Sequence, residues 1–144
     1  MPAVSITAGP SLTAAVALLR AAELPTEDLT DSHLRHFFMA SLPNEAVGLV
    51  GLELHGREAL LRSLVVDPNL RTKGIGSQLV EHAEAYARAR GVESVYLLTT
   101  TAEKFFAHLG YSRVERRDAP EGISTTREFS SICPANSVFM LKHL

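Results

Sequence analysis

The feature that most constrains this 144-residue sequence is a glycine-containing turn between an apolar stretch and a helix. Residues 59–66 are largely apolar and predict a strand, whereas residues 75–90 repeat apolar side chains at helical spacing before Gly91. Between them lies Arg71-Thr72-Lys73-Gly74-Ile75-Gly76. Glycines there let the main chain approach an anion, which backbone N–H groups and the helix dipole would favour. A tight turn without a ligand is the alternative.

The spacing of the glycines separates this turn from two common nucleotide-binding loops. A P-loop has four residues between its glycines, followed by Lys-Ser or Lys-Thr. Here one residue separates Gly74 from Gly76. The dinucleotide-binding fingerprint needs a further glycine where this chain has Leu79. The turn therefore predicts an anion site of a third kind.

The remaining sequence predicts short strands and helices within one domain, residues 1–144. Apolar residues make up 46% of the chain, enough for a core at this length. We expect strands at 4–7, 37–42, 46–55, 59–66, 95–98, 111–115 and 137–141, and helices at 12–23, 75–90 and 102–109. Residues 26–36 predict a loop or a short helix, and 116–136 a long loop. The strand, helix and strand from 59 to 98 predict one parallel pair in an otherwise antiparallel arrangement.

Charge and cysteine content narrow the expected partners. The net charge is −2 and Lys and Arg form no run, which argues against a nucleic-acid or anionic-membrane partner. The N-terminal stretch lacks a basic leader and is interrupted by Gly9-Pro10, so we expect a cytoplasmic protein without a spanning helix. Cys133 is the only cysteine, which excludes internal disulfides and all-thiolate metal sites. We expect no metal.

Two motifs carry a resemblance to a known family. The run Val65-Val66-Asp67-Pro68-x-x-Arg71-x-x-Gly74-x-Gly76 resembles the acetyl-CoA motif of the GNAT superfamily of N-acetyltransferases. Phe105-Phe106-x-x-x-Gly110-Tyr111 resembles the family's later motif, and the order of elements agrees along the chain. The resemblance implies an α/β (α+β) fold with a mixed, mostly antiparallel sheet, a central splayed parallel strand pair and flanking helices. It also implies transfer of acetyl from acetyl-CoA to the amine of a small molecule, by direct attack on the thioester.

The resemblance further implies where the cofactor lies. The main chain of Leu64, Val65 and Val66 would pair with the pantetheine arm, and the amide of Val65 or Val66 would donate to the oxyanion. The pyrophosphate would lie in a cradle made by Arg71, Thr72, Lys73, Gly74, Ile75, Gly76 and Ser77. Thr101 and Phe106 would also contact the cofactor, although many relatives have a tyrosine acid where this chain has Phe106. Protonation of the thiolate would then fall to water or Thr101.

A narrower resemblance concerns the acceptor. Leu61-Arg62-Ser63-Leu64, the run from Leu97 to Ala102, and Glu128-Phe129-x-x-x-Cys133-Pro134 resemble small acetyltransferases encoded with arsenic-resistance genes. Those are in turn similar to N-acetylglutamate-synthase-like enzymes. The match implies an amino-acid-like acceptor, organoarsenicals included, with Ser63, Thr99 and Cys133 near it. The alternatives are a threonine cap on the following helix, for which Thr101 is suited, and a buried structural cysteine.

Glu53 is the candidate general base. Strand alternation places it on a face of otherwise apolar or small side chains. If a four-residue turn pairs His55 with Glu58, then Gly51 faces Arg62 and Glu53 lies diagonal to Arg62. Glu53 would deprotonate the amine, and Arg62 would clamp a carboxylate of the acceptor. A structural ion pair between the two is the alternative.

The absence of a tyrosine at position 106 raises a second reading of the whole chain. A degenerate acyl-CoA-binding module, which senses the cofactor or serves interactions, would keep the glycine turn and lose turnover. Acceptor-dependent release of the CoA thiol distinguishes the two readings. Either protein could form a homodimer.

Overall fold

The computed structural model describes residues 4–24, 26–126, 129 and 137–144, with the backbone alone at 71–73. Its strands form one sheet in the order β1-β2-β3-β4-β5-β7-β6. The strands are β1 (Ser5–Ala8), β2 (Phe37–Leu42), β3 (Glu45–His55), β4 (Glu58–Val66), β5 (Ser94–Thr99), β6 (Ser112–Arg113) and β7 (Val138–His143). Among these, β4 and β5 pair in parallel and the other neighbours are antiparallel. The expected mixed, mostly antiparallel sheet with one parallel pair is confirmed.

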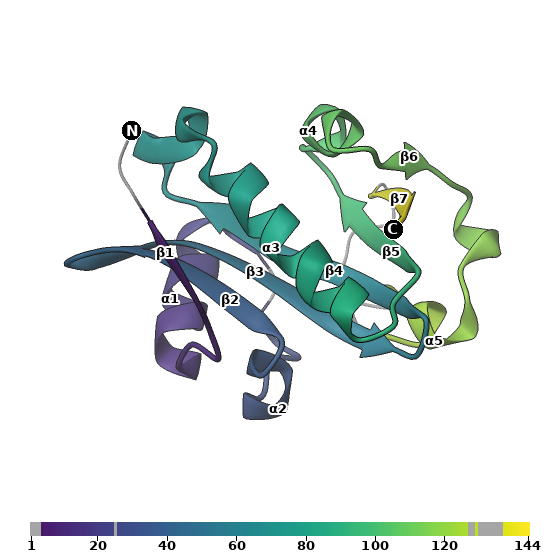
Figure 1. The fold of residues 1–144 in the computed structure, drawn as a ribbon, viewed down its shortest axis with the longest axis horizontal. Helices are drawn as coiled ribbons and strands as arrows, with labels where there is room; N and C mark the ends of the chain where they lie inside the picture. Colours follow the sequence, from purple (N-terminus) through teal and green to yellow (C-terminus); the bar gives the residue numbers. More distant parts are fainter. Residues whose placement is uncertain (1–3, 25, 127–128, 130–136) are drawn as a thin grey trace.

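Helices cover both faces of the sheet (Figure 1). The α-helices are α1 (Leu12–Ala21), α2 (Asp31–Leu34), α3 (Ile75–Ala89), α4 (Glu103–His108) and α5 (Glu121–Ser124), with 3-10 turns at Pro68–Lys73 and Arg116–Asp118. The long helix α3 packs on one face, and α1 and α2 pack on the other. None of the described helices is long and apolar enough to cross a membrane.

The two longer helices form for reasons that the sequence displays. The Ser11 hydroxyl accepts a hydrogen bond from the amide of Ala14 at 3.2 Å and so caps the start of α1. Gly74 precedes α3 in the left-handed conformation, with φ of 79°, which glycine adopts without steric cost. The apolar stripe of α3 is buried in the core, as its spacing predicts: Ile75, Leu79, Val80, Ala83 and Ala87.

A β-bulge bends β4 next to its parallel partner. Gly51 pairs with Arg62, and Leu49 pairs with Val65. One residue of β3 between these two pairs therefore faces two residues of β4, Ser63 and Leu64. Ser63, one of the two, has φ of 61°, the left-handed conformation that bulges use. Pairing with β5 ends at Leu61, just before the bulge. The two strands then diverge, as Figure 1 shows and as a splayed pair requires.

The C-terminal third differs from the expectation. The strand expected at 111–115 is only Ser112–Arg113, because the chain leaves β7 after the amide of Val114 donates to the Phe139 carbonyl at 2.9 Å. The segment expected as a long loop contains helix α5, whose Ile123 is fully buried. Ile123 packs with Leu60 and thereby holds this segment on the sheet.

A buried polar network joins α3 to β7. The Tyr111 hydroxyl donates to Oε2 of Glu84 at 2.8 Å, and Nζ of Lys142 donates to Oε1 of Glu84 at 3.0 Å. Burial, and then the charge of Glu84, raise the pKa of the Tyr111 hydroxyl far above its ordinary value. The ring of Tyr111 also meets Phe106 edge-on. Tyr111 therefore packs in the core, and it is a poor proton donor.

Candidate active site

Arg62 of β4 is the centre of a buried polar cluster. Its side chain has no exposed area. Both terminal nitrogens donate to the carboxylate of Asp28, with 2.8 Å between Nη2 and Oδ1. Nη1 also donates to Oε2 of Glu53 at 2.8 Å, and Nε donates to the Ser63 hydroxyl at 3.0 Å. One guanidinium thus holds together two carboxylates and a hydroxyl.

This geometry favours the structural ion pair over the carboxylate clamp that we expected of Arg62. A clamp must present its two parallel N–H donors to an incoming carboxylate. In Arg62 these donors already bind Asp28 and Glu53, and the side chain is inaccessible. An acceptor carboxylate would have to displace one of them. The register that predicted the meeting of Glu53 and Arg62 is confirmed, since Gly51 pairs with Arg62 and His55 with Glu58.

Asp28 is a member of the cluster that sequence reasoning missed. It lies in the connection between α1 and α2 and is 5% exposed, whereas the neighbouring acid, Glu27, is exposed. Burial alone would raise the pKa of Asp28. The hydrogen bonds and charge of Arg62, with a smaller contribution from His33, outweigh this effect and hold the pKa below its ordinary value of 3.8. Asp28 is therefore a charged anchor that fastens this connection to β4.

Glu53 lies where the parallel strands part. Its side chain is 11% exposed, and Arg62, its partner, directly follows the last residue of β4 that pairs with β5. Arg62 holds Oε2, whereas Oε1 lies 3.8 Å from Nε2 of His55. The two oxygens therefore have different surroundings, and Oε1 is the one not taken by the guanidinium.

Gly51 and Phe37 form the floor of this cluster. A Cβ at position 51 would lie 2.3 Å from two carbons of the Phe37 ring. The ring is fully buried, and the Arg62 guanidinium carbon lies 5.9 Å from its centre. Glycine is thus required at position 51 so that an aromatic ring can support the arginine.

Asp28, His33 and Glu53 each bring one possible metal-ligand atom within 4.8 Å of the others. The guanidinium of Arg62 is bonded to two of the three residues. A positive charge that the protein itself supplies therefore already offsets part of the negative charge of this group, and a metal ion would have to compete with it.

The expected cofactor strand and turn lie beside this cluster. Val65 and Val66 are buried and Leu64 is half-buried at the end of β4. Asp67 then starts the 3-10 turn, accepting a hydrogen bond at Oδ1 from the Asn69 amide at 2.9 Å. The backbone of Arg71, Thr72 and Lys73 completes this turn.

Helix α3 starts directly after this turn. Its first turn, with Ile75 and Ser77, has N–H groups without intrahelical acceptors and contains no acidic residue. These are the features of an anion site at a helix start. Gly76 also has a packing role. A Cβ there would lie 3.2 Å from the Phe105 ring, so this glycine lets α4 pack on α3.

The other expected contacts lie at the end of β5 and in α4. The hydroxyl of Thr99 accepts a hydrogen bond from the Ala102 amide at 3.0 Å, just before α4. Ala102 is the N-cap of α4 and receives no side-chain cap among the described residues, so Thr101 does not fill the capping role for which it was the expected candidate. Thr101 is exposed. Phe106 is 5% exposed and belongs to the core. Cys133 lies outside the described residues.

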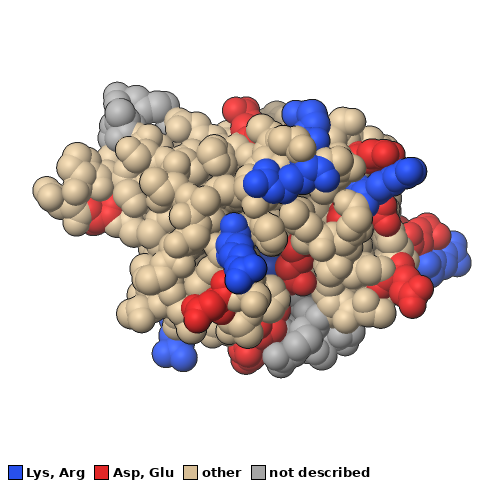
Figure 2. All heavy atoms as spheres, turned by 60° about the horizontal axis from the view of Figure 1, so that its bottom comes forward, with Lys and Arg blue, Asp and Glu red and all other residues tan. Residues whose placement is uncertain are grey.

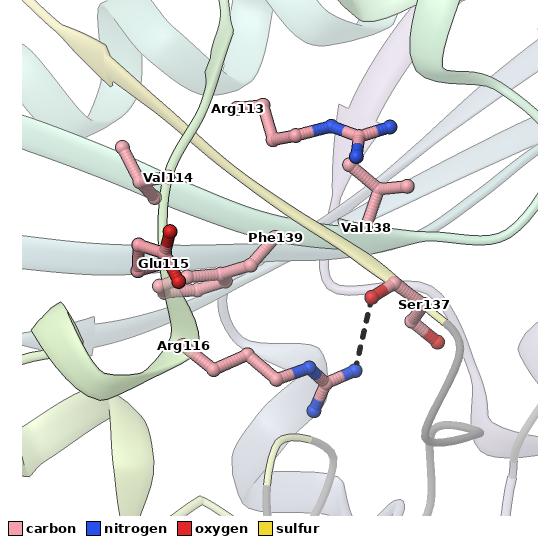
Figure 3. Close-up of a pocket in the computed structure, with 7 residues that line it drawn as sticks. All are labelled: Arg113, Val114, Glu115, Arg116, Ser137, Val138 and Phe139. Atoms are coloured by element: carbon pink, nitrogen blue, oxygen red, sulfur yellow. Dashed lines mark hydrogen bonds between the residues drawn. The ribbon is translucent and has the colours of Figure 1, made fainter.

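A separate pocket of about 390 Å³ opens at the edge of the sheet (Figure 3). Residues 113–116 and 137–139 line it, and Nη2 of Arg116 donates to the carbonyl oxygen of Ser137 at 3.1 Å. In the sheet, β4, β5 and β7 separate Arg113 of β6 from Glu53 of β3. The face in Figure 2 intersperses acidic and basic side chains, so its charges form no large patch of one sign.

Comparison with known proteins identifies the family. Residues 11–111 match the model of the Acetyltransferase (GNAT) family. The uncharacterized N-acetyltransferase CT2212 of Chlorobaculum tepidum is 37% identical over 63% of this chain and 59% of its own length. An amino-acid acetyltransferase of Ralstonia nicotianae is 38% identical over 40% of this chain and 13% of its own length. The matched regions thus cover less than two thirds of each relative.

The fold matches that of a protein of known structure. N-acetylglutamate synthase from Neisseria gonorrhoeae, complexed with coenzyme A and N-acetyl-glutamate, superposes with a TM-score of 0.86 at 21% identity. The match covers 100% of this chain and 36% of the synthase. Nothing in these matches concerns arsenic, so that narrower resemblance stays a prediction. The family match spans the turn, the bulged strand β4 and Glu53, and the chain belongs to the GNAT acetyltransferase family.

Proposed function

We propose that this protein is an acetyl-CoA-dependent N-acetyltransferase that acts on the amine of a small, amino-acid-like acceptor, with Glu53 as the general base. The observation that carries the proposal is the carboxylate of Glu53. Arg62 fixes one of its oxygens at 2.8 Å, beside the point where β4 and β5 part. A base of this kind must be held in place and yet keep one oxygen for the proton it takes.

The cofactor would lie along β4 and the start of α3. The main chain from Leu64 to Val66 would pair with the pantetheine arm in the space that the bulge opens. The turn from Arg71 to Ser77 would hold the pyrophosphate, since a helix start favours negative charge. An amide at Val65 or Val66 would donate to the oxyanion. Relatives in the family support this arrangement, as does the N-acetylglutamate synthase that was solved with coenzyme A.

The reaction would proceed by direct attack. Glu53 takes one proton from the acceptor ammonium, and the neutral amine forms a bond with the thioester carbonyl carbon. The C–S bond then breaks, and the thiolate takes the second nitrogen proton through water or Thr101. Tyr111 does not fill the place of the missing tyrosine acid, because its hydroxyl is bonded to Glu84 in the core.

The charges of the cluster support an amine at this position. Asp28 and Glu53 carry two negative charges against the single positive charge of Arg62. The net charge of these three side chains is therefore negative, which favours an ammonium over a carboxylate at Oε1 of Glu53. The amino-acid acetyltransferase relatives support an acceptor of the amino-acid type.

An acceptor screen tests the proposal. Purified protein is mixed with acetyl-CoA and single amino acids, their decarboxylated amines, and analogues with arsinate or phosphinate groups, and free thiol is measured. We expect thiol release that depends on an amino-acid-like amine, and mass spectrometry should find the acetylated product. Tight binding of acetyl-CoA without acceptor-dependent thiol release would instead support the degenerate binding module.

A further inference from the structure

His55 contains a buried ring nitrogen that makes no hydrogen bond within the described part of the chain. Among the described side chains, Nε2 of His55 is the buried nitrogen or oxygen that has no hydrogen bond. Buried polar groups are nearly always paired, and an exception calls for a specific explanation, of which a catalytic role is one. The atom lies 3.8 Å from Oε1 of Glu53, the oxygen that Arg62 leaves available.

We propose that His55 is a proton-relay residue, which takes from Glu53 the proton of the acceptor ammonium and passes it to the solvent. The proposal rests on the proposed acetyl transfer and adds the route by which its proton leaves. His55 acts through Glu53 and touches neither the acceptor nor acetyl-CoA.

The strand places the two side chains for this exchange. Glu53 and His55 are two residues apart on β3 and so point to the same face of the sheet. Their separation of 3.8 Å exceeds a hydrogen bond, but a small rotation of either side chain closes it. Because Arg62 holds Oε2, the carboxylate can turn only slightly, and Oε1 stays directed at the ring.

The side chain of His55 reaches from the buried carboxylate toward the surface. Nε2 is buried, yet 30% of the side chain is exposed, so other atoms of the side chain reach the solvent. Helix α5 packs against the ring: a Cβ on Gly122 would lie 3.0 Å from Cβ of His55 and 3.5 Å from Cγ. Because Gly122 has no side chain, the ring fits between β3 and α5.

The charged groups around the ring are consistent with the transient gain of a proton. Glu53 lies on the same strand, Glu58 is paired with His55 across the turn, and Glu121 precedes Gly122 in α5. The cation of the cluster, Arg62, is engaged by Asp28 and Glu53. The carboxylate of Glu53, 3.8 Å from Nε2, would therefore stabilise a positively charged imidazole.

Each turnover releases one proton, which His55 passes to the solvent. The ammonium and acetyl-CoA yield the amide, the CoA thiol and one proton. Of the two protons that nitrogen loses, one goes to the thiolate and the other to Oε1 of Glu53. Nε2 of His55 accepts the proton that Glu53 has taken, and the imidazolium then gives its Nδ1 proton to water. Exchange with the solvent restores the Nδ1–H form, and Glu53 is again a carboxylate.

Removal of the imidazole tests the relay. With the best acceptor from the screen, His55→Ala should lower kcat about tenfold, with the KM for acetyl-CoA unchanged. This is less than the roughly hundredfold lower end of the range for a general base, because His55 acts only after Glu53 has taken the proton. Free imidazole should restore most of the rate in a saturable way, since it can occupy the vacated space. His55→Gln serves if the alanine variant folds poorly. His108→Ala, an exposed histidine of α4, is the matched control and should neither lose activity nor respond to imidazole.

A double variant distinguishes the relay from packing. Because His55 acts through Glu53, adding His55→Ala to Glu53→Gln should cause no further loss of kcat. A wild-type rate in His55→Ala, a loss that imidazole does not rescue, or fully additive losses would each overturn the relay while leaving the acetyl transfer in place. Failure of the wild-type protein to acetylate any amine would overturn the proposed function itself.

Discussion

The anchor between Asp28 and Arg62 makes a prediction about folding stability that needs no substrate. In Asp28→Asn the side chain keeps its shape and loses its charge. Asp28 accepts from two nitrogens of the guanidinium. Asparagine retains one oxygen acceptor and turns its own N–H₂ group toward the other donor, so one charge-assisted hydrogen bond is lost.

The size of the effect follows from that geometry. A hydrogen bond to a charged group contributes about 1.5–3 kcal/mol. Removing one member of a buried ion pair costs about 3–5 kcal/mol when the partner is left alone. Glu53 still pairs with Arg62, so we expect Asp28→Asn to lower the free energy of unfolding by about 2–3 kcal/mol. For a chain of this length, the melting temperature should fall by roughly 5–10 °C.

The dependence on pH provides the sharper test. Because the pKa of Asp28 is lower in the folded protein than its ordinary value of 3.8, its contribution is complete well above pH 3.8. The contribution is lost as the pH falls below 3.8 and through the folded value. The difference in stability between wild type and Asp28→Asn should therefore be constant near neutral pH and shrink in acid.

Thermal unfolding followed by circular dichroism, from pH 3 to pH 8 in matched buffers, measures this difference. Glu27→Gln is the matched control, because the neighbouring acid is exposed and its loss should change stability by less than about 0.5 kcal/mol. If Asp28→Asn melted like Glu27→Gln, or if its deficit did not shrink in acid, the anchoring role of Asp28 would be wrong.

Two further variants test other parts of the fold. Gly51→Ala places a Cβ 2.3 Å from the buried Phe37 ring. It should lower the free energy of unfolding in a denaturant titration by about 3 kcal/mol, the upper end of the usual range for overpacking. A variant as stable as the wild type would mean that the ring can move away from Arg62. Gly74→Ala should cost about 1 kcal/mol, because alanine must adopt φ of 79°, and should weaken coenzyme A binding in calorimetry; an unchanged affinity would place the pyrophosphate elsewhere.

The architecture could be predicted where local patterns determine it. Helix α3 has a long amphipathic stripe bounded by glycines, and the strand pairing around the turn at Gly56 follows from its length. The length of this turn also determines the strand register that puts Glu53 beside Arg62. Helix α5 was missed because it has four residues and one buried apolar side chain, Ile123, too few for a periodic signal.

The site was predicted less completely because its chemistry depends on tertiary contacts. Glu27 and Asp28 are adjacent acids in a polar segment, and only the folded chain shows that one is exposed and the other buried against Arg62. Arg62 could be read as a substrate clamp because nothing in the sequence reveals that Asp28 already occupies it. For His55 there was a signal, since it shares a strand face with Glu53.

The pH dependence of turnover in Glu53→Gln tests the proposed base most directly. At saturating acetyl-CoA and acceptor, kcat of this variant should fall about a hundredfold, at the low end of the range for a general base. The loss should be largest at low pH, where the acceptor is an ammonium and needs a base, and smaller as the pH rises. A variant with the wild-type rate and an unchanged pH–rate profile would show that Glu53 does not deprotonate the acceptor.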